Sequence, residues 1–315
     1  MKIGFYNDFR PCVLTNRGVV DVSRAVRPFQ AGSPQLLMEN IIINFNILRS
    51  QLEAAAARGK AVPLSQVRLR PPLPRPGKVL MGQGNYMEFV AGGKPRPLSM
   101  FWKSPDATIG PGDTVILPPF KARIFHHEAE LALVIGREAR NVPAARAMDY
   151  VFGYFAGVDV SARAPWIGGP GANANTGDGP WLPGNFGKCF DTFLPLGPAI
   201  TTADEVPDPH NLHVEYWVNG QIRHDYHTND MEHRIPELIE TMSSIMTLKP
   251  GDMMMCGTNH QGLGPLQDGD VGEIRIDIIG GFSNPVVDPE KRSWPVGVET
   301  AAAERVRATR EPART

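Results

Sequence analysis

The chain has 315 residues, a formal net charge of -1 at pH 7 and 42% hydrophobic residues. This length allows one large or two modest domains with a sizeable core, and the balanced charge gives no basic field that would attract nucleic acid. We find no apolar run long enough to span a bilayer and no secretory signal. The three cysteines are far apart, which favours reduced thiols. We therefore expect a soluble, cytoplasmic protein without nucleic-acid or membrane partners.

The N-terminal part of the chain predicts short strands followed by a helix. Residues 1–30 have the pattern of short strands, and Val19–Val22 resembles a hairpin return after an Asn-Arg-Gly turn. From Leu36 to Arg58, apolar residues recur at three- and four-residue spacing and Gly59 follows as a C-cap, which predicts one helix. Prolines then gather between residues 63 and 76, and this stiff stretch is the best candidate for a domain boundary.

The remainder of the chain predicts a mainly β body with a few helices. Gly-Asp turns precede the apolar segments TVILPP, MMMCGT and VGEIRIDII. Another strand runs from Leu212 to Val218 and enters an Asn-Gly hairpin turn. A helix is predicted between these strands, with Pro236 near its start and an apolar stripe that ends at Ile245. Alternation of turn and strand is typical of a β fold.

Two segments have less regular patterns. Residues 166–187 are rich in glycine and asparagine and predict a long loop, which is often functional beside a site and is otherwise a surface excursion. Its GGPGAN run lacks the preceding strand and the lysine of a phosphate-binding loop, so we reject nucleotide binding. Residues 299–315 predict a short helix and a frayed end without an assigned function.

Three carboxylates adjoin strands of the β body, and this pattern indicates a metal. Glu128 and Glu130 stand two residues apart in FHHEAELALVIG, and Asp159 follows in GYFAGVDVSAR. Alternate residues of a strand face the same side, so the two glutamates lie roughly 6 to 7 Å apart at the backbone. A divalent cation relieves their repulsion, and acidic oxygen ligands suit Mg²⁺, Mn²⁺ or Ca²⁺ better than a soft metal.

The alternative is that these acids form the solvated face of a strand, which is the commoner role of acidic residues in a sheet. The residues after Glu130 argue against it, because Leu131–Ile135 is an apolar run typical of a strand buried on both faces. Burying a carboxylate at the start of such a strand costs free energy unless the carboxylate is paired or bound to a metal.

Six segments, in this order, resemble the fumarylacetoacetate hydrolase superfamily: HHEAELALVIG, DYVFGYFAGVDVSAR, GKCFDTFLPLGP, VNGQIRHDYHTNDM, IPELIETMSSIMTLKPGD and GTNHQGLGPLQDGD. The resemblance is specific because six separate segments agree in sequence and order. The residues before the proline-rich stretch look like the small N-terminal domain that many members carry. We therefore predict an N-terminal domain with its linker at 1–70, a catalytic domain at 71–282 and a C-terminal extension at 283–315.

The resemblance implies an α+β fold that is mainly β: a mixed β-sheet roll with a small N-terminal α/β domain, usually as a homodimer. It implies Mg²⁺ or Mn²⁺ held by two glutamates and an aspartate, which match Glu128, Glu130 and Asp159. It also implies a small oxo acid as substrate, such as an acylpyruvate, fumarylpyruvate, fumarylacetoacetate, oxaloacetate or an unsaturated dioate from aromatic ring cleavage. The family lysine matches Lys188, and the threonine of its Gly-Thr turn matches Thr258.

The charges of such a site give Lys188 and Thr258 a chemical role. Three carboxylates around a dication leave a net negative charge, so an anionic substrate needs an added cation, which Lys188 could supply. A 2-oxo acid or 1,3-diketone could then chelate the ion through two oxygens, and the ion would stabilise the enolate formed when a C–C bond breaks. Thr258 and nearby N–H groups could hold a substrate carboxylate, although a threonine after glycine is more often a turn residue.

The chain departs from the family in its lid segment. In many members an asparagine-tyrosine pair is followed by a histidine three residues after the tyrosine and a glutamate three further on, and these two activate water. Here the segment is GNYMEFVAGG, in which Asn85 and Tyr86 match. Phe89 and Gly92 replace the histidine and the glutamate. The usual base is therefore absent. Attack of water on a ketone needs a general base within hydrogen-bond reach, so hydrolysis would need another side chain in that role.

Three side chains could replace that base: Glu88 on the lid, His260 in the GTNHQG turn, and His224 where the family often has glutamine. Each could equally be a solvated or structurally bonded side chain. We place His260 first because its turn should lie beside Thr258.

Substrate-contacting or supporting roles are expected for Tyr86, His126, Arg163 and His224, and two of these residues, Arg163 and His126, lie near the metal loop. The DVSARA segment ends in Ala164 where many members have aspartate, so Arg163 either contacts substrate or only braces the loop. His126 has the same strand parity as both glutamates and could orient one of them, whereas His127 should face the other way. A zinc site at His126 and His127 is disfavoured, because adjacent strand residues diverge.

The leading hypothesis is a metal-dependent hydrolase that cleaves a C–C bond in a small 2-oxo or 1,3-dioxo acid, of the acylpyruvate or fumarylpyruvate type, in catabolism. The first alternative is a decarboxylase or tautomerase/isomerase of an oxo-dioate on the same scaffold, which Phe89 favours because such reactions depend less on a water-activating base. The second is a metal-binding homologue that has lost catalysis.

Overall fold

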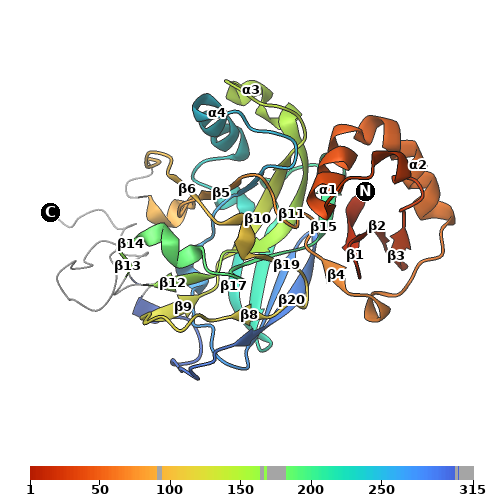
Figure 1. Cartoon of the computed structure of the whole chain (residues 1–315). Helices are drawn as coiled ribbons and strands as arrows, with labels where there is room; N and C mark the ends of the chain where they lie inside the picture. Colours follow the sequence, from red (N-terminus) through yellow and green to blue (C-terminus); the bar gives the residue numbers. More distant parts are fainter. Residues whose placement is uncertain (91–93, 164–166, 169–181, 302–303, 305–315) are drawn as a thin grey trace.

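The computed structural model describes residues 1–90, 94–163, 167–168, 182–301 and 304. Within these residues strands dominate, and the β framework carries α-helices at two places on its surface (Figure 1). The mainly β, α+β fold predicted from the sequence is therefore confirmed. The predicted loop at 166–187 and the predicted C-terminal helix lie largely outside the described residues, as do Gly92 and Ala164.

The larger sheet has, among the described residues, eleven strands in the order β3-β2-β1-β15-β11-β10-β18-β5-β6, with β4 beside β1 and β7 beside β15. Its pairs are antiparallel except β18 with β5 and β15 with β7. The bounds are β1 (Lys2–Tyr6), β2 (Arg10–Thr15), β3 (Gly18–Asp21), β4 (Leu69–Arg70), β5 (Val79–Gly82), β6 (Met100–Trp102), β7 (Thr108–Ile109), β10 (Ala129–Ile135), β11 (Val151–Val158), β15 (Leu194–Thr202) and β18 (Met253–Met255).

Strand β10 lies in the middle of this sheet, and every one of its residues is buried. Its apolar run Leu131–Ile135 therefore forms the centre of the core, as a continuous apolar strand requires. Because residues on both faces of β10 are buried, a side chain at its start is removed from water. Glu130 lies at that position.

The smaller sheet has the order β17-β16-β19-β20-β8 in the described part of the chain. Asn219 and Gly220 form its predicted hairpin turn with positive φ angles of 51° and 75°, a conformation for which these two residue types are suited. The bounds are β8 (Val115–Ile116), β16 (His213–Val218), β17 (Gln221–His227), β19 (Val271–Ile276) and β20 (Gly280–Val287). The described residues also form two short strand pairs, β9 (Ile124–His126) with β12 (Ser161–Arg163) and β13 (Ile167–Gly168) with β14 (Leu182–Pro183).

The helices cover the β framework at two places (Figure 1). Helices α1 (Pro34–Ile43) and α2 (Phe45–Arg58) lie beside β1, β2 and β3, and α3 (Ala144–Ala147) packs on α4 (Ile235–Ile245). Helix α4 buries Ile235, Leu238 and Ile239 on the predicted stripe. Among the described residues, none of the helices has both the length and the apolar character needed to cross a bilayer.

The prediction of one helix from Leu36 to Arg58 is wrong in one respect, because the chain leaves the helix at Asn44 and begins α2 at Phe45. The side-chain amide of Asn44 donates to the carbonyl of Asn40 at 2.8 Å, as its own backbone N–H also does. An asparagine that bonds the backbone in this way competes with regular helix geometry.

The N-terminal strands are part of the larger sheet rather than a sheet of their own. Strand β1 pairs with β15, with Lys2 opposite Thr201 and Ile3 opposite Ile200. Strand β4, which lies within the proline-rich stretch of residues 63–76, returns to pair with the other end of β1. The backbone hydrogen bonds thus run without interruption from β3 to β6.

Candidate metal centre and acid-base site

Three acidic side chains meet where β10 and β11 lie side by side. Glu128 precedes β10, Glu130 is its second residue, and Asp159 follows β11. The two strands are antiparallel, and the Asp159 N–H donates to the Glu128 carbonyl at 2.8 Å. One carboxylate oxygen from each acid lies within 4.8 Å of those of the other two. All three residues are at most 4% exposed, so the solvated-face alternative is wrong.

Two cations hold the oxygens of Glu128. Lys188, at the end of the 3₁₀ helix η7 (Gly184–Lys188), places Nζ 2.7 Å from Glu128 Oε2 and 2.5 Å from Asp159 Oδ2. Arg163 donates through Nη2 to the other oxygen of Glu128. Burial alone would raise the pKa of Glu128, but the charges of Lys188 and Arg163 outweigh it and hold that pKa well below its usual value.

A third cation was not predicted from the sequence. Lys103 follows β6, is fully buried, and places Nζ 2.6 Å from Asp159 Oδ1. It also donates to the Val160 carbonyl at 3.3 Å. Burial lowers the pKa of Lys103, and the Asp159 charge opposes that effect. The available sequence signal was a lysine directly after the short apolar strand Met100–Trp102, where a charge has no local partner.

Glu130 has the opposite electrostatic environment to Glu128. Burial, followed by the charges of Asp159 and Glu128, raises the pKa of Glu130 well above its usual value. Its Oε2 accepts the Gly257 N–H at 2.6 Å. Neighbouring cations therefore neutralise the negative charge of Glu130 less than that of Glu128. A divalent cation would remove the remaining repulsion among the carboxylates. Three buried carboxylates with close oxygens fit a hard ion such as Mg²⁺, Mn²⁺ or Ca²⁺.

The backbone beside Glu130 has room only for glycine. Gly257 has a φ of +87°, and a Cβ there would lie 2.9 Å from Asn85 Cβ and 3.0 Å from the Gly84 carbonyl oxygen. Asn85 holds the turn, since its amide donates to the Cys256 carbonyl at 2.7 Å. Thr258 comes next and is 1% exposed, and its Oγ1 makes no hydrogen bond with the described residues.

Glu88 and His260 form a pair beside the carboxylates. Glu88 lies in η3 (Met87–Phe89), after β5, and His260 begins η10 (His260–Gly262), after β18. Because β5 and β18 are parallel neighbours, the segments that follow them leave the sheet at the same end. His260 Nδ1 lies 3.1 Å from Glu88 Oε1, which also accepts the His260 backbone N–H. His260 Nε2 lies 3.8 Å from Glu128 Oε1.

His224 has a different partner. Its Nε2 lies 3.0 Å from His127 Nδ1, and the His127 ring stacks on Tyr216 with centroids 4.5 Å apart. Both histidines are at most 1% exposed. Tyr86 is also fully buried, with its ring edge-on to Tyr226 at 4.9 Å. The structure therefore brings together Glu88 and His260, whereas His224 bonds to a buried histidine.

The buried His224 predicts acid sensitivity. Burial lowers the pKa of His224 to about 4 from an ordinary 6.5. The unfolded chain takes up this proton near pH 6.5 and the folded chain only near pH 4, so stability falls as the pH drops through that window, by on the order of 3 kcal/mol. Urea unfolding with EDTA at pH 7, 5 and 4 should show His224→Gln losing less stability than the wild type. Identical losses would contradict this prediction.

Arg163 and His126 lie together beside Glu128. Arg163 Nε donates to His126 Nδ1 at 3.1 Å, while its Nη2 reaches Glu128. Burial lowers the pKa of His126 to about 4, so the ring is neutral near pH 7. His126 thus faces Arg163, whereas His127 faces His224, and the two do not converge on a zinc site. Arg163 is 26% exposed at its side chain, so it could also reach a bound molecule.

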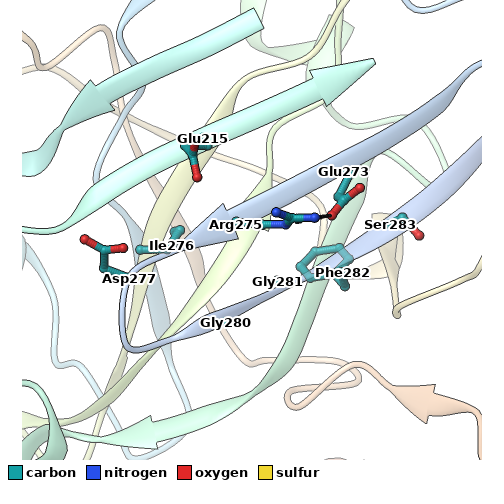
Figure 2. Close-up of a pocket in the computed structure, with 9 residues that line it drawn as sticks. All are labelled: Glu215, Glu273, Arg275, Ile276, Asp277, Gly280, Gly281, Phe282 and Ser283. Atoms are coloured by element: carbon teal, nitrogen blue, oxygen red, sulfur yellow. Dashed lines mark hydrogen bonds and ion pairs between the residues drawn. The ribbon is translucent and has the colours of Figure 1, made fainter. Parts of the chain in front are cut away.

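A pocket of about 450 Å³ lies elsewhere, on the smaller sheet (Figure 2). Charged side chains line it, and Arg275 Nε donates to Glu273 Oε1 at 2.8 Å. The remaining lining residues are Glu215, Ile276, Asp277, Gly280, Gly281, Phe282 and Ser283. None of these residues belongs to the carboxylate cluster or the Glu88–His260 pair. We therefore place the chemistry at the carboxylates.

The chain resembles known proteins in sequence and in fold. Residues 81–287 match the family described as Fumarylacetoacetate (FAA) hydrolase C-terminal. The crystal structure of maleylpyruvate hydrolase from Sphingobium sp. SYK-6 in complex with manganese(II) ion and pyruvate has a TM-score of 0.77 at 35% identity, covering 91% of this chain and 99% of that one. The 5-carboxymethyl-2-hydroxymuconate delta-isomerase from Mycobacterium smegmatis has a TM-score of 0.68 at 34% identity, covering 91% and 100%.

A curated relative extends this comparison to a third reaction. The mitochondrial oxaloacetate tautomerase of Rattus norvegicus is 34% identical over 280 residues, which are 86% of this chain and 84% of that protein. Similar proteins thus include a hydrolase, an isomerase and a tautomerase. The resemblance inferred from the six sequence segments is confirmed.

Proposed function

We propose an activity for this chain, which belongs to the fumarylacetoacetate hydrolase family: divalent-metal-dependent hydrolysis of a C–C bond in a small 2-oxo or 1,3-dioxo acid of the acylpyruvate or fumarylpyruvate type. The observation that carries this proposal is the Glu88–His260 pair beside Glu128. Hydrolysis needs a general base, and the lid residues that usually supply one are replaced. The manganese and pyruvate bound to the similar maleylpyruvate hydrolase support the metal and the product class.

Glu128, Glu130 and Asp159 would hold Mg²⁺ or Mn²⁺. A bound ion supplies Lewis-acid polarisation of the oxo acid's oxygens and stabilises enolate charge. Lys188 and Arg163 bring positive charge to the carboxylates, which lowers the repulsion that an anionic substrate would meet. The buried hydroxyl of Thr258 supports a role for that residue in holding a substrate carboxylate.

The Glu88–His260 pair accounts for the proton transfers. A proton on Nδ1 that is directed at Glu88 leaves Nε2 as the basic nitrogen of His260. Nε2 takes a proton from water as the water oxygen bonds to the ketone carbon. The C–C bond then breaks, its electron pair goes to the pyruvate enolate, and His260 returns the proton to the enolate carbon. The products are one carboxylic acid and one 2-oxo acid.

An isomerising reaction is the second candidate. The same His260 nitrogen could remove a proton from the carbon beside a carbonyl and return it elsewhere, without the addition of water. The similarity to the rat oxaloacetate tautomerase favours this alternative. A decarboxylation would instead release CO₂, and a binding protein without catalysis would give no product.

Product analysis tests the proposal. Purified protein with Mg²⁺ or Mn²⁺, and with EDTA as the control, would be assayed by NMR against acylpyruvates, fumarylpyruvate and oxaloacetate. Metal-dependent formation of two acids from one substrate is the expected result. An isomer or CO₂ as the product would replace hydrolysis by the corresponding alternative, and no turnover of any substrate would overturn the assignment of activity.

We also propose that the protein works as a cytoplasmic homodimer in catabolism. The smaller sheet supports a dimer because it carries exposed apolar side chains on adjacent strands, among them Val271 on β19, Val287 on β20 and Ile116 on β8. Light scattering during gel filtration would show twice the chain mass of 34.5 kDa. A monomer at micromolar concentration would contradict the proposed dimer.

A further inference from the structure

The C-terminal extension reaches the candidate site through residues 294–299, here called the C-terminal strap. The Trp294 indole N–H donates to the Arg123 carbonyl at 2.7 Å, and its ring lies edge-on to Phe125 at 5.8 Å. At the other end of the strap, the Glu299 N–H donates to the Leu263 carbonyl at 2.7 Å. The strap is therefore bound to β9 and to Arg123, the residue before β9. It is also bound to the turn that follows His260.

The strap also touches that turn by close backbone approach. A Cβ on Gly264 would lie 2.3 Å from the Gly297 carbonyl oxygen, so the two segments leave no room for a side chain. The turn itself is closed by the Leu263 N–H, which donates to the His260 carbonyl at 3.2 Å. The segment that presents His260 thus rests on the strap.

A chain of contacts runs from the strap to the metal-binding carboxylates. Glu299 Oε2 lies 2.7 Å from His126 Nε2, and its other oxygen accepts from Arg123. His126 Nδ1 accepts from Arg163 Nε at 3.1 Å. Arg163 Nη2 then donates to Glu128 Oε1. Glu299, His126 and Arg163 lie at most 26% exposed at their side chains, so water competes little for these contacts.

The contacts require one arrangement of protons. An arginine Nε–H can only donate, so Nδ1 of His126 must be the acceptor. A neutral His126 therefore carries its proton on Nε2, the nitrogen that lies 2.7 Å from Glu299 Oε2. The sequence of groups is anion, neutral ring, cation and anion, and each neighbour is electrostatically favourable. Glu299 therefore favours the same ring tautomer that the Arg163 contact requires.

We propose that the C-terminal strap is a positioning element of the active site, in which Glu299 acts through His126 and Arg163 to hold Glu128 in its metal-binding orientation. The inference deepens the proposed function and rests on it for the identity of the site. It assigns a role to the C-terminal strap, which follows the part of the chain that matches the family. Partners that orient a metal ligand typically change metal affinity by about 10- to 100-fold when removed.

The test compares Glu299→Ala with Glu290→Ala. Glu290 lies on the same extension, and its side chain pairs with Arg292 at 3.2 Å rather than with a residue of the site. Calorimetric titration with Mn²⁺ should give a dissociation constant about 10- to 100-fold higher for Glu299→Ala and an unchanged one for Glu290→Ala. Thermal unfolding in EDTA measures separately the stability lost with the Glu299 contacts to His126 and Arg123, and the affinities are compared at a temperature at which both variants are folded. Glu299→Gln, which keeps an oxygen acceptor beside His126, should recover part of the affinity.

Two results would overturn the inference. One is a wild-type Mn²⁺ affinity in Glu299→Ala, and the other is an equal loss in both variants. If Glu299→Ala does not fold, the comparison is made with Glu299→Gln. A wild-type Mn²⁺ affinity and kcat in that variant would count against a role for the Glu299 charge. Metal affinity is measured without substrate, so it stays informative if no oxo acid is turned over. In that case the proposed activity fails while the role of the strap is still decided.

Discussion

Glu130→Gln is expected to abolish metal binding and activity while making the metal-free protein more stable. The pKa of Glu130 is raised well above its usual value by burial and by the charges of Asp159 and Glu128. An acid whose pKa is raised on folding opposes folding at neutral pH, where the unfolded chain would ionise it freely. Glutamine keeps an oxygen that can accept the Gly257 N–H but carries no charge. The substitution therefore removes a repulsion and, with it, one of three anionic ligands.

Two measurements check this prediction. Calorimetry with Mn²⁺ or Mg²⁺ should show affinity lower by more than about 100-fold, since even supporting partners of a ligand are worth 10- to 100-fold. Thermal unfolding in EDTA should give a Tm above that of the wild type, and added metal should no longer raise it. Glu215→Gln, in the pocket of the smaller sheet, is the matched control. Wild-type metal affinity in Glu130→Gln would exclude the proposed metal centre.

His260→Asn is expected to reduce kcat by about 100- to 10,000-fold, the usual range for the loss of a general base, with metal affinity retained. Glu88→Gln should cause a smaller loss, because Glu88 only directs the Nδ1 proton of His260. Since the two residues act as one unit, the double variant should be little slower than His260→Asn alone. The effect should fall on kcat rather than on the binding of Mn²⁺.

Steady-state kinetics of these variants should be measured at saturating metal, with His213→Gln as the control. His213 is a histidine on β16 that bonds Asp225 at 2.7 Å. Rates for His260→Asn within a few-fold of the wild type would show that water is activated elsewhere. The proposed hydrolytic mechanism would then fail even if the metal centre were intact.

The carboxylate cluster was predictable from the sequence because its evidence is local. Glu128 and Glu130 stand at the start of one apolar strand, and Asp159 follows another. The structure brings these residues together through the antiparallel pairing of β10 and β11. Burial made a charge at this position costly, so the pattern itself indicated a ligand. The mainly β fold was predictable for the same reason, from turn residues and strand periodicity.

The acid-base pair was predictable only as separate candidates. Glu88 and His260 are 172 residues apart, and what joins them is the parallel pairing of β5 with β18. No local pattern in either segment reports that pairing. Lys103 and Glu299 were missed for a related reason, since each has its partner in a distant segment. The break in the long helix depends on one side-chain amide, that of Asn44.

The pairing of β1 with β15 limits how this protein can be divided. The part that matches the family begins at residue 81, well after β1, β2 and β3. A fragment cut there would uncover the edge of β15 at Ile200 and Thr201, where backbone groups now bond to β1. Such a bare edge is a template for strand addition from other chains. The first residues of the chain thus occupy the edge of β15, and we expect a fragment without them to associate through that edge.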